Sequence, residues 1–554
     1  MPALSPITFE RTPDSYRHWR VEVEAPLATV IMAVDPDGAL RDGYQLKLNS
    51  YDLAVDIELA DIVQRLRFEH PGVRAVVVTS AADKVFCAGA NIQMLAGSTH
   101  HDKVNFCKFT NETRNAIEDA SANSGQVWLA AVNGTAAGGG YELALACEEI
   151  ILVDDRSSSV SLPEVPVLGV LPGTGGLTRL VDKRHVRRDL ADLFATRTDG
   201  CRGQQAIDWG LVDSLSPPTS FADHVRDRAR ARAGDPDRSG RPGGIHLLPL
   251  ARQTEPDALR YPHVEVTIDR PLSSATFTLS APTGQQPATS DEVVAAGSAH
   301  WPLAVARAFD DAMLHLRFNE PEIGTWILRT SGDHQAVLGA DEVLRENAGH
   351  WLVDEIVLNW KRTFKRLDLS ARTIVTLVEP GSCFAGTLAE LVLAADRSFM
   401  LTGGLEGSGL APAAVIFTEA NDGRYPMANG LTRLASRFWG HDEAIADVRA
   451  HFGKELLAAE ADELGLVTST PDDIDWDDDV RLMLEERAAF SPDALTGMEA
   501  SFRFVGPETI ETKIFGRLTA WQNWIFQRPN ASGPDGSLAR YGSGSRPAYD
   551  RRRV

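Results

Sequence analysis

Three consecutive glycines run directly into a stretch of good helix formers, and this junction constrains the fold more than any other feature of the chain. Gly138, Gly139 and Gly140 precede the sequence YELALAC at 141–147, which carries an acidic residue near its start. Such a junction is typical of a helix N-terminus, where free N–H groups and the helix dipole favour an anion. In isolation, a glycine run is more often a turn that only packs a helix closely. The segments on either side decide between these readings.

Two further segments stand in a fixed order around the glycine run. Residues 86–92 read FCAGANI, residues 133–144 read NGTAAGGGYELA, and residues 163–180 read PEVPVLGVLPGTGGLTRL. Together they resemble the crotonase (enoyl-CoA hydratase/isomerase) superfamily, in register over residues 86–180. The resemblance implies a spiral of ββα turns that binds a coenzyme A thioester.

The resemblance also implies a role for individual residues. The amides of Ala88 and Gly139 would form an oxyanion hole, because N–H groups aimed at a thioester oxygen stabilise its developing charge. Glu142 and Glu164 would be the two acid/base carboxylates that position and deprotonate water and return protons.

Substrate contacts are expected beside these groups and in an earlier loop. Gly89 and Gly138 adjoin the two amide donors, and the sequence KLNS at 47–50 resembles the superfamily's early CoA-contacting loop, which selects Lys47 and Asn49.

Cys107 is a further candidate, in the sequence HHDKVNFCK at 100–108. The two neighbouring lysines are expected to lower the pKa of its thiol and make it a better proton donor or nucleophile. The alternatives are a packed helical cysteine and, with His100 and His101, a zinc site whose ligand spacing is not a paired one. Cys87, inside the first segment, is interpreted as a structural neighbour.

The segment FGRLTAWQNWIFQRPN at 515–530 resembles a long bacterial branch of the superfamily. That branch hydrolytically opens the ring of 2,3-epoxybenzoyl-CoA, giving a semialdehyde CoA thioester and formate in aerobic benzoate degradation. Two alternatives stay open: another acyl-CoA hydratase, isomerase or hydrolase of the superfamily, since a fold does not fix a function, and a noncatalytic CoA-ester binding protein.

A fainter second copy of the first half follows it. Glu142 in ELALA returns as Glu390 in ELVLA, and GLTRL at 176–180 returns at 430–434. The copy has Gly386-Thr387 in place of the glycine run and no counterpart of Pro163-Glu164. We therefore expect an α/β fold of tandem crotonase-like domains, the second degenerate and structural, with a linker at 233–244. The expected divisions are 1–250, 251–485 and a helical C-terminal segment at 486–554.

Local patterns supply a few elements of that fold. Apolar β-branched runs at 75–78 and 150–153 predict strands, and the stretches 53–67 and 141–147 predict helices.

Composition limits the partners. The chain has 554 residues and a formal net charge of −22, which argues against nonspecific binding to nucleic acid or a membrane surface. Five scattered cysteines suit a reducing compartment, and the absence of a long apolar run predicts a soluble cytoplasmic protein. We expect a homo-oligomer, with a dimer favoured, that needs no cofactor and no metal beyond the acyl-CoA substrate.

Overall fold

The computed structural model describes residues 6–234, 243–405 and 407–554, and the chain divides into two compact units. The N-terminal unit is Phe9–Leu247, and the C-terminal unit is Leu248–Val554 together with residues 6–8. The predicted boundary lay near residue 250. Most of the predicted linker, 235–242, lies outside the described residues.

The N-terminal unit is built on a six-stranded sheet in the order β1-β2-β3-β5-β7-β9. Strands β1 and β2 form an antiparallel hairpin, and every later neighbour pairs in parallel. The predicted strands at 75–78 and 150–153 are confirmed as β3 and β7. The bounds are β1 Trp19–Glu24, β2 Leu27–Met32, β3 Ala75–Ser80, β5 Val127–Val132, β7 Glu149–Val153 and β9 Ser214–Ser216.

A second, three-stranded parallel sheet stands beside the first and leads into the candidate site. Its order is β4-β6-β8, with β4 Lys84–Cys87, β6 Gly134–Ala137 and β8 Val160–Ser161. These strands end at the three segments that the sequence pattern selected, so the parallel pairing gathers those segments at one edge.

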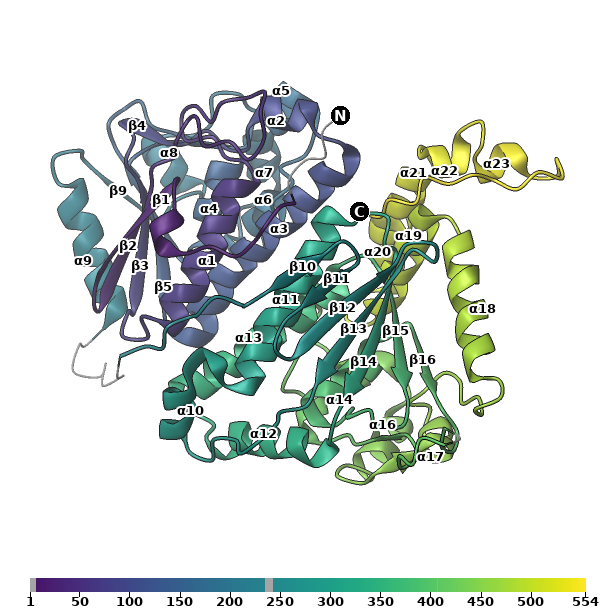
Figure 1. Ribbon diagram of the computed structural model, residues 1–554. Helices are drawn as coiled ribbons and strands as arrows, with labels where there is room; N and C mark the ends of the chain where they lie inside the picture. The colour runs from purple at the N-terminus through teal and green to yellow at the C-terminus, as the bar shows by residue number, and fades with distance from the viewer. Residues whose placement is uncertain (1–5, 235–242, 406) are drawn as a thin grey trace. The chain divides into compact units, whose positions relative to one another are not determined.

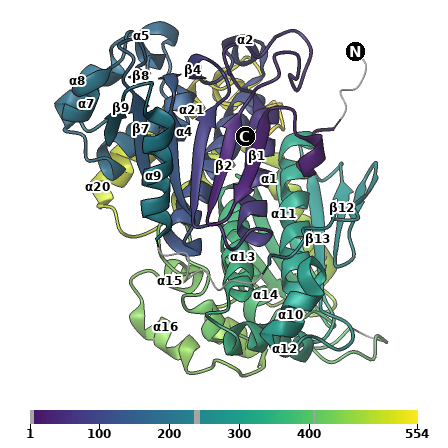
Figure 2. The ribbon, with the colours of Figure 1, turned by 90° about the vertical axis from the view of Figure 1, so that its left-hand side faces the viewer.

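Helices cover both faces of the six-stranded sheet (Figures 1 and 2). The predicted helix at 53–67 is confirmed as α1. Asp52 caps the start of this helix, because its side chain accepts a hydrogen bond from Ala54 N. The helix predicted at 141–147 is α4, which begins two residues earlier. The bounds are α1 Leu53–Phe68, α2 Ile92–Gly97, α3 His100–Asp119, α4 Gly139–Ala146, α5 Glu164–Leu168, α6 Gly176–Thr178, α7 Arg188–Ala195, α8 Gly203–Asp208 and α9 Phe221–Ala233.

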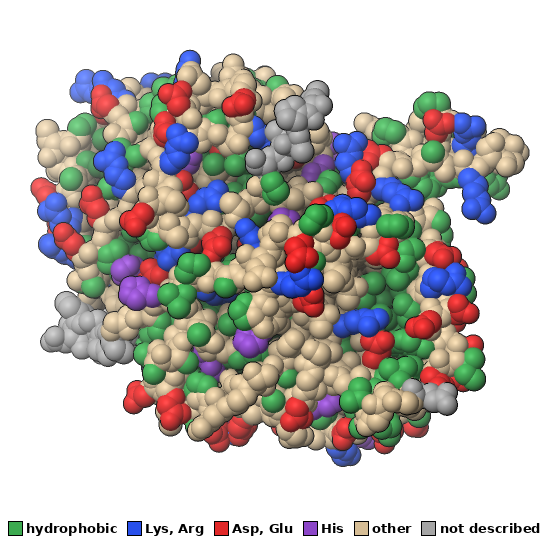
Figure 3. Space-filling model, in the orientation of Figure 1, with side chains coloured by type: hydrophobic (Ala, Val, Ile, Leu, Met, Phe, Trp, Pro, Cys, Tyr) green, Lys and Arg blue, Asp and Glu red, His purple; other side chains and the backbone are tan. Residues whose placement is uncertain are grey.

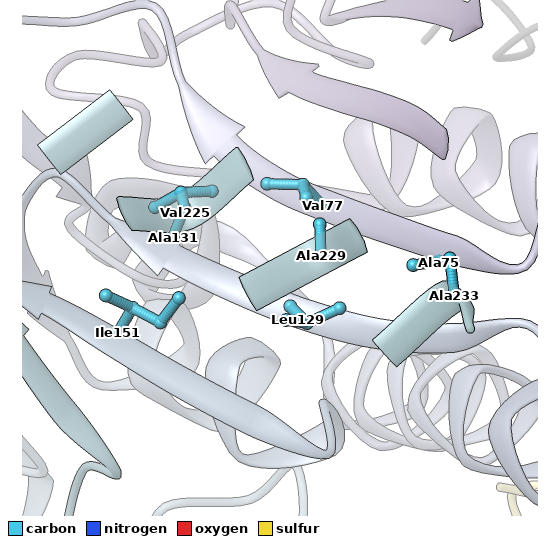
Figure 4. Close-up of a cluster of buried hydrophobic side chains, with 8 residues drawn as sticks. All are labelled: Ala75, Val77, Leu129, Ala131, Ile151, Val225, Ala229 and Ala233. Atoms are coloured by element: carbon cyan, nitrogen blue, oxygen red, sulfur yellow. The ribbon is translucent and has the colours of Figure 1, made fainter. Parts of the chain in front are cut away.

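Small side chains let α9 lie close against the sheet. Ala229 and Ala233 of this helix pack with Val225 onto alternate residues of three strands, and all are buried (Figure 4). The strand residues are Ala75, Val77, Leu129, Ala131 and Ile151. Burial of this apolar surface holds the rigid platform from which the loops of the candidate site extend.

The C-terminal unit contains a seven-stranded sheet in the order β10-β11-β12-β13-β14-β15-β16. Its first four strands are antiparallel, and β13 to β16 are parallel. The bounds are β10 Gln253–Glu255, β11 Ala258–Arg260, β12 Val264–Asp269, β13 Ser274–Ser280, β14 Thr325–Ser331, β15 Thr373–Val378 and β16 Arg397–Met400. Strands β17 Ala414–Val415 and β18 Leu456–Leu457 form a small separate pair.

The helices of the C-terminal unit continue into the predicted helical segment at its end. Trp521 and Trp524 of α21 meet edge to face there, with ring centroids 5.7 Å apart. The bounds are α10 Ser290–Ala296, α11 Trp301–Asn319, α12 His334–Glu346, α13 Trp351–Leu369, α14 Gly386–Ala394, α15 Arg433–Arg437, α16 Asp442–Arg449, α17 Ala458–Glu463, α18 Trp476–Ala489, α19 Pro492–Arg503, α20 Ile510–Lys513, α21 Thr519–Phe526, α22 Pro529–Ser532 and α23 Ser537–Arg540.

Acidic and basic side chains are interspersed over the face drawn in Figure 3. Within the described ranges, no helix has both the length and the apolar character needed to cross a membrane.

Candidate active site

The glycine run forms the junction between β6 and α4. Gly138 has φ 52° and ψ −127°, a backbone conformation open to glycine alone, and its N–H donates to the Ser161 carbonyl over 2.9 Å. Gly139 is the first residue of α4, so its N–H has no acceptor within the helix. No acceptor for this amide occurs among the residues that the structure describes.

The segment after β4 comes into contact with this junction. Gly89 has φ 86°, and a Cβ at this position would lie 2.7 Å from the Ala137 carbonyl oxygen and 2.9 Å from Gly139 N. Only glycine permits that approach. The predicted second donor, Ala88, is already engaged, because its N–H donates to the Leu48 carbonyl over 3.1 Å. A substrate oxygen would have to displace that carbonyl or share the Ala88 amide with it.

Glu142 lies in the first turn of α4 and is 2% exposed. Its Oε1 accepts from Thr174 N at 3.0 Å and Gly176 N at 2.8 Å, and its Oε2 accepts a short hydrogen bond from the Thr174 hydroxyl. A Cβ at Gly176 would lie 2.9 Å from Glu142 Oε1. The carboxylate therefore holds the 173–176 turn in place, and Oε2 keeps lone-pair capacity for one further donor.

Glu164 begins α5 and lies beside the glycine junction. A Cβ at Gly138 would lie 2.4 Å from its Oε1, so the carboxyl reaches the start of α4. Its Oε2 is buried and has no hydrogen-bond partner among the described residues. Burial, assisted by the charge of Glu142, raises the pKa of Glu164 to about 7. Both predicted carboxyl groups thus border the N-terminus of α4, and only Glu164 keeps an oxygen without a partner among the described residues.

Cys107 lies on α3 and faces the same turn. Its Sγ would be 3.2 Å from a Cβ at Gly173. The prediction that lysines lower its pKa is wrong: burial, followed by the charges of Glu142 and Asp56, raises the pKa of the thiol to about 11. Near neutral pH this side chain is a protonated thiol, suited to donating a proton or a hydrogen bond.

Side chains of α3 and Arg179 hold the 173–176 turn in place. Asn111 donates to the Gly173 carbonyl over 3.0 Å, and Arg179 donates to the Thr174 carbonyl over 3.0 Å. The Arg179 guanidinium also pairs with Glu118 and donates to Asn115, both on α3. The turn that contacts Glu142 is therefore clamped from two sides.

The early loop at 47–50 contains two predicted substrate-binding residues, Lys47 and Asn49, which differ in their surroundings. Asn49, buried and with φ 50°, donates to Ser80 Oγ over 2.8 Å and accepts from Val34 N over 3.2 Å. Its side chain thus ties the loop to the neighbouring strands. Lys47 is exposed. Cys87, as interpreted from the sequence, is a buried neighbour whose thiol donates to the Asn49 carbonyl over 3.0 Å.

Sequence reasoning missed Tyr51 and Arg114, which adjoin the same junction. The Tyr51 hydroxyl would lie 1.9 Å from a Cβ at Gly139, and the Arg114 guanidinium stands 5.4 Å from the centre of the Tyr51 ring. Neither residue is part of a recognisable sequence motif, so the sequence alone gives no reason to select them. The zinc alternative finds no support, since no group of three or more metal-ligating side chains occurs within the described residues.

Comparisons with known proteins agree with this geometry. The enoyl-CoA hydratase/isomerase family model matches residues 45–239, which include the glycine junction and both carboxyl groups. The chain belongs to the crotonase, or enoyl-CoA hydratase/isomerase, family. Within it, the chain is 53% identical to benzoyl-CoA-dihydrodiol lyase of Aromatoleum evansii over 553 residues, covering 100% of this chain and 99% of that protein.

Other relatives share only part of the chain. Carnitinyl-CoA dehydratase of Proteus mirabilis is 30% identical over 191 residues, covering 33% of this chain and 66% of that protein. The solved structure of an enoyl-CoA hydratase from Bacillus anthracis is 28% identical, with a TM-score of 0.34, and covers 39% of this chain and 77% of that one.

Proposed function

We propose that this chain is a lyase that hydrolytically opens the ring of 2,3-epoxybenzoyl-CoA to a semialdehyde CoA thioester and formate, in aerobic benzoate degradation. The observation that carries the proposal is the 53% identity to a benzoyl-CoA-dihydrodiol lyase over both full lengths. The site supports it, because a helix N-terminus with a free amide stands between two carboxyl groups and a neutral thiol.

The acyl oxygen binds at the start of α4. The Gly139 N–H donates to the thioester carbonyl, and the helix dipole stabilises the charge that collects there. Ala88 adds the second donor when the substrate oxygen takes the place of the Leu48 carbonyl. The polarised carbonyl withdraws electrons from the attached ring and prepares it for attack by water.

Glu164 and Glu142 divide the proton transfers. Glu164, with a pKa of about 7, changes protonation state in the working range, so it takes a proton from water and returns one as the ring opens. Glu142 keeps the 173–176 turn in place and offers Oε2 as the acceptor that orients water. The neutral Cys107 thiol is placed to donate a proton to an oxygen of the opening ring.

The C-terminal unit is proposed to be the degenerate second copy. In both units an antiparallel hairpin leads into parallel strands, and a glycine precedes or begins the helix carrying Glu142 or Glu390. In the second unit the Asp341 carboxylate accepts from Thr387 N over 2.6 Å, so an internal side chain fills the helix N-terminus. Glu390 is paired with Arg433 and accepts from Asn421. These groups are committed to packing, which leaves one catalytic site per chain.

The remaining assignments are part of the same proposal. The substrate is the acyl-CoA itself, no cofactor or metal takes part, and the protein works in the cytoplasm as a homodimer that binds neither nucleic acid nor a membrane. The five cysteines are free thiols, which suits a reducing compartment.

A single assay tests the proposal. Purified protein mixed with 2,3-epoxybenzoyl-CoA, without added metal, flavin or nicotinamide, is expected to release formate in step with loss of substrate. Turnover of a straight-chain enoyl-CoA in its place would indicate another reaction of the superfamily. Binding of both thioesters without turnover of either would indicate a noncatalytic CoA-ester binding protein.

A further inference from the structure

The Tyr51 hydroxyl is a buried polar group that finds no hydrogen-bond partner in the described part of the chain. Tyr51 is 1% exposed, and its Oη has no hydrogen-bond partner among the described residues. An unsatisfied buried hydroxyl costs about 1–3 kcal/mol, so native proteins seldom keep one without a use. The hydroxyl occupies the space where a Cβ of Gly139 would stand, 1.9 Å from that position.

The nearby carboxylates do not serve as acceptors for this hydroxyl. Asp56 and Glu142 both act electrostatically on Tyr51. Asp56 is engaged by Arg114 and by the Thr110 hydroxyl, and Glu142 is engaged by the 173–176 turn. The O–H of Tyr51 therefore has no acceptor within the ranges that the structure describes.

The rest of the residue is held firmly. Tyr51 N donates to the Gly89 carbonyl over 3.0 Å, and its own carbonyl accepts from Asn91 N over 2.8 Å. The ring lies 5.8 Å from Phe106 and carries the Arg114 guanidinium over its face. A side chain fixed in this way can present a donor without losing conformational freedom when the ligand binds.

We propose that Tyr51 is a further catalytic residue, which donates a hydrogen bond from its hydroxyl to the acyl oxygen of the bound CoA thioester, beside the Gly139 amide. The inference rests on the proposed function, because it takes an acyl-CoA as the ligand of the α4 N-terminus. Burial raises the pKa of Tyr51 well above its ordinary value, so the phenol keeps its proton and remains a donor.

The test is Tyr51→Phe, which removes the hydroxyl and keeps the ring. Formate release from 2,3-epoxybenzoyl-CoA is expected to fall about a hundredfold in kcat, the usual effect of losing one oxyanion-hole donor. The carbonyl stretching frequency of bound benzoyl-CoA, which falls when donors contact the oxygen, is expected to shift less than in the wild type. The Tm is expected to stay the same or rise, since no hydrogen bond of the free protein is lost.

Tyr141→Phe is the matched control. Tyr141 is also fully buried, but its hydroxyl donates to the Leu211 carbonyl over 2.7 Å. This variant is expected to lower the Tm and to leave the carbonyl shift unchanged.

The possible outcomes separate this inference from the proposed function. A wild-type carbonyl shift and wild-type kcat in Tyr51→Phe would overturn the inference, as would a loss of kcat that comes with a lower Tm and an unchanged carbonyl shift. Failure of the wild-type protein to release formate would reject the proposed reaction alone. The carbonyl shift of bound benzoyl-CoA would then still decide whether Tyr51 contacts the acyl oxygen.

Discussion

At the scale of single residues, the two glutamates of the site differ in how the protein uses them. Glu142 accepts three hydrogen bonds from the 173–176 turn, whereas one carboxyl oxygen of Glu164 is buried and has no partner in the described ranges. The first carboxylate is part of the framework and the second is free to exchange protons. Substitutions that are chemically alike should therefore have different effects at the two positions.

We expect Glu142→Gln to lower both turnover and stability, and Glu164→Gln to lower turnover only. Each should slow kcat at least about a hundredfold, the usual contribution of a positioned acid or base. The side-chain oxygen of the Glu142→Gln variant can still accept from the Thr174 and Gly176 amides, but its NH2 takes the place of Oε2, so the Thr174 hydroxyl loses its charged acceptor and the Tm should fall. Formate release and thermal unfolding of both variants check this. Equal Tm values for the two variants, or near-normal turnover in both, would contradict it.

The raised pKa of Glu164 also predicts how stability depends on pH. Between about 4.5 and about 7 the folded carboxyl holds a proton that the unfolded chain releases, so stability falls as pH rises through this window and is level above it. Glu164→Gln removes this contribution. Relative to the wild type, the variant should gain about 1–2 kcal/mol on going from pH 5 to pH 8, allowing for partial solvation of the carboxyl.

Thermal or urea unfolding at the two pH values measures the gain. Glu22→Gln, on the exposed face of β1, serves as the control and should follow the wild-type profile. A Glu164→Gln profile parallel to the wild type would show that this pKa is not raised.

Sequence pattern could place the donors and carboxyl groups of the site, because their spacing reflects backbone constraints that glycine and helix position impose. It selected Gly139, Glu142 and Glu164, all of which border the start of α4. It could not show that the Ala88 amide is engaged by Leu48, because that contact depends on left-handed backbone at Leu48 and Asn49. It also misjudged Cys107, since burial and the charges of Glu142 and Asp56 raise the pKa of its thiol in the folded unit.

At the scale of elements, α3 and the 173–176 turn act as one assembly. Asn111, Asn115 and Glu118 lie along one face of α3, and Arg179 connects the turn to that face. The N–H groups of Thr174 and Gly176 in this turn donate hydrogen bonds to Glu142. The position of the Glu142 carboxylate is thus set by contacts that run from α3 through Arg179 to the turn.

Arg179→Lys should loosen this assembly while keeping its charge, because an ammonium group cannot reproduce the planar contacts of a guanidinium. We expect amide exchange at Thr174 and Gly176 to speed up about tenfold, equivalent to about 1.4 kcal/mol, with a comparable fall in kcat. Hydrogen-exchange mass spectrometry measures the first effect. Arg187→Lys, which changes only an exposed pair with Asp189, should leave both unchanged. Unaltered exchange in Arg179→Lys would show that the clamp is unimportant.

At the scale of the whole molecule, the segment after α23 returns to the interior of the C-terminal unit. Arg553 is 2% exposed and donates to the Gly324 carbonyl over 2.9 Å, to Thr373 over 3.0 Å and to Thr496 over 3.2 Å. It also pairs with the buried Glu499. One guanidinium therefore joins β15, α19 and the loop before β14.

We expect Arg553→Ala to destabilise the C-terminal unit by about 3–5 kcal/mol, because it leaves Glu499 buried without its main cation. Urea unfolding of the full chain should show the loss. Arg552→Ala removes the neighbouring, exposed arginine and should change stability by less than about 1 kcal/mol. Equal midpoints for the two variants would show that the buried pair contributes little.

The junction of Gly89, Gly138, Gly139 and Gly140 has one more consequence. Because each of these positions lacks room for a Cβ, the backbone donor that we propose for the acyl oxygen carries no side chain for mutation to alter. New chemistry in such a framework has to arise at its borders, on the neighbouring helix, the early loop or the residue after Pro163. Under the proposed function, an ancestor could therefore exchange one reaction for another while the backbone contact to the thioester stayed unchanged.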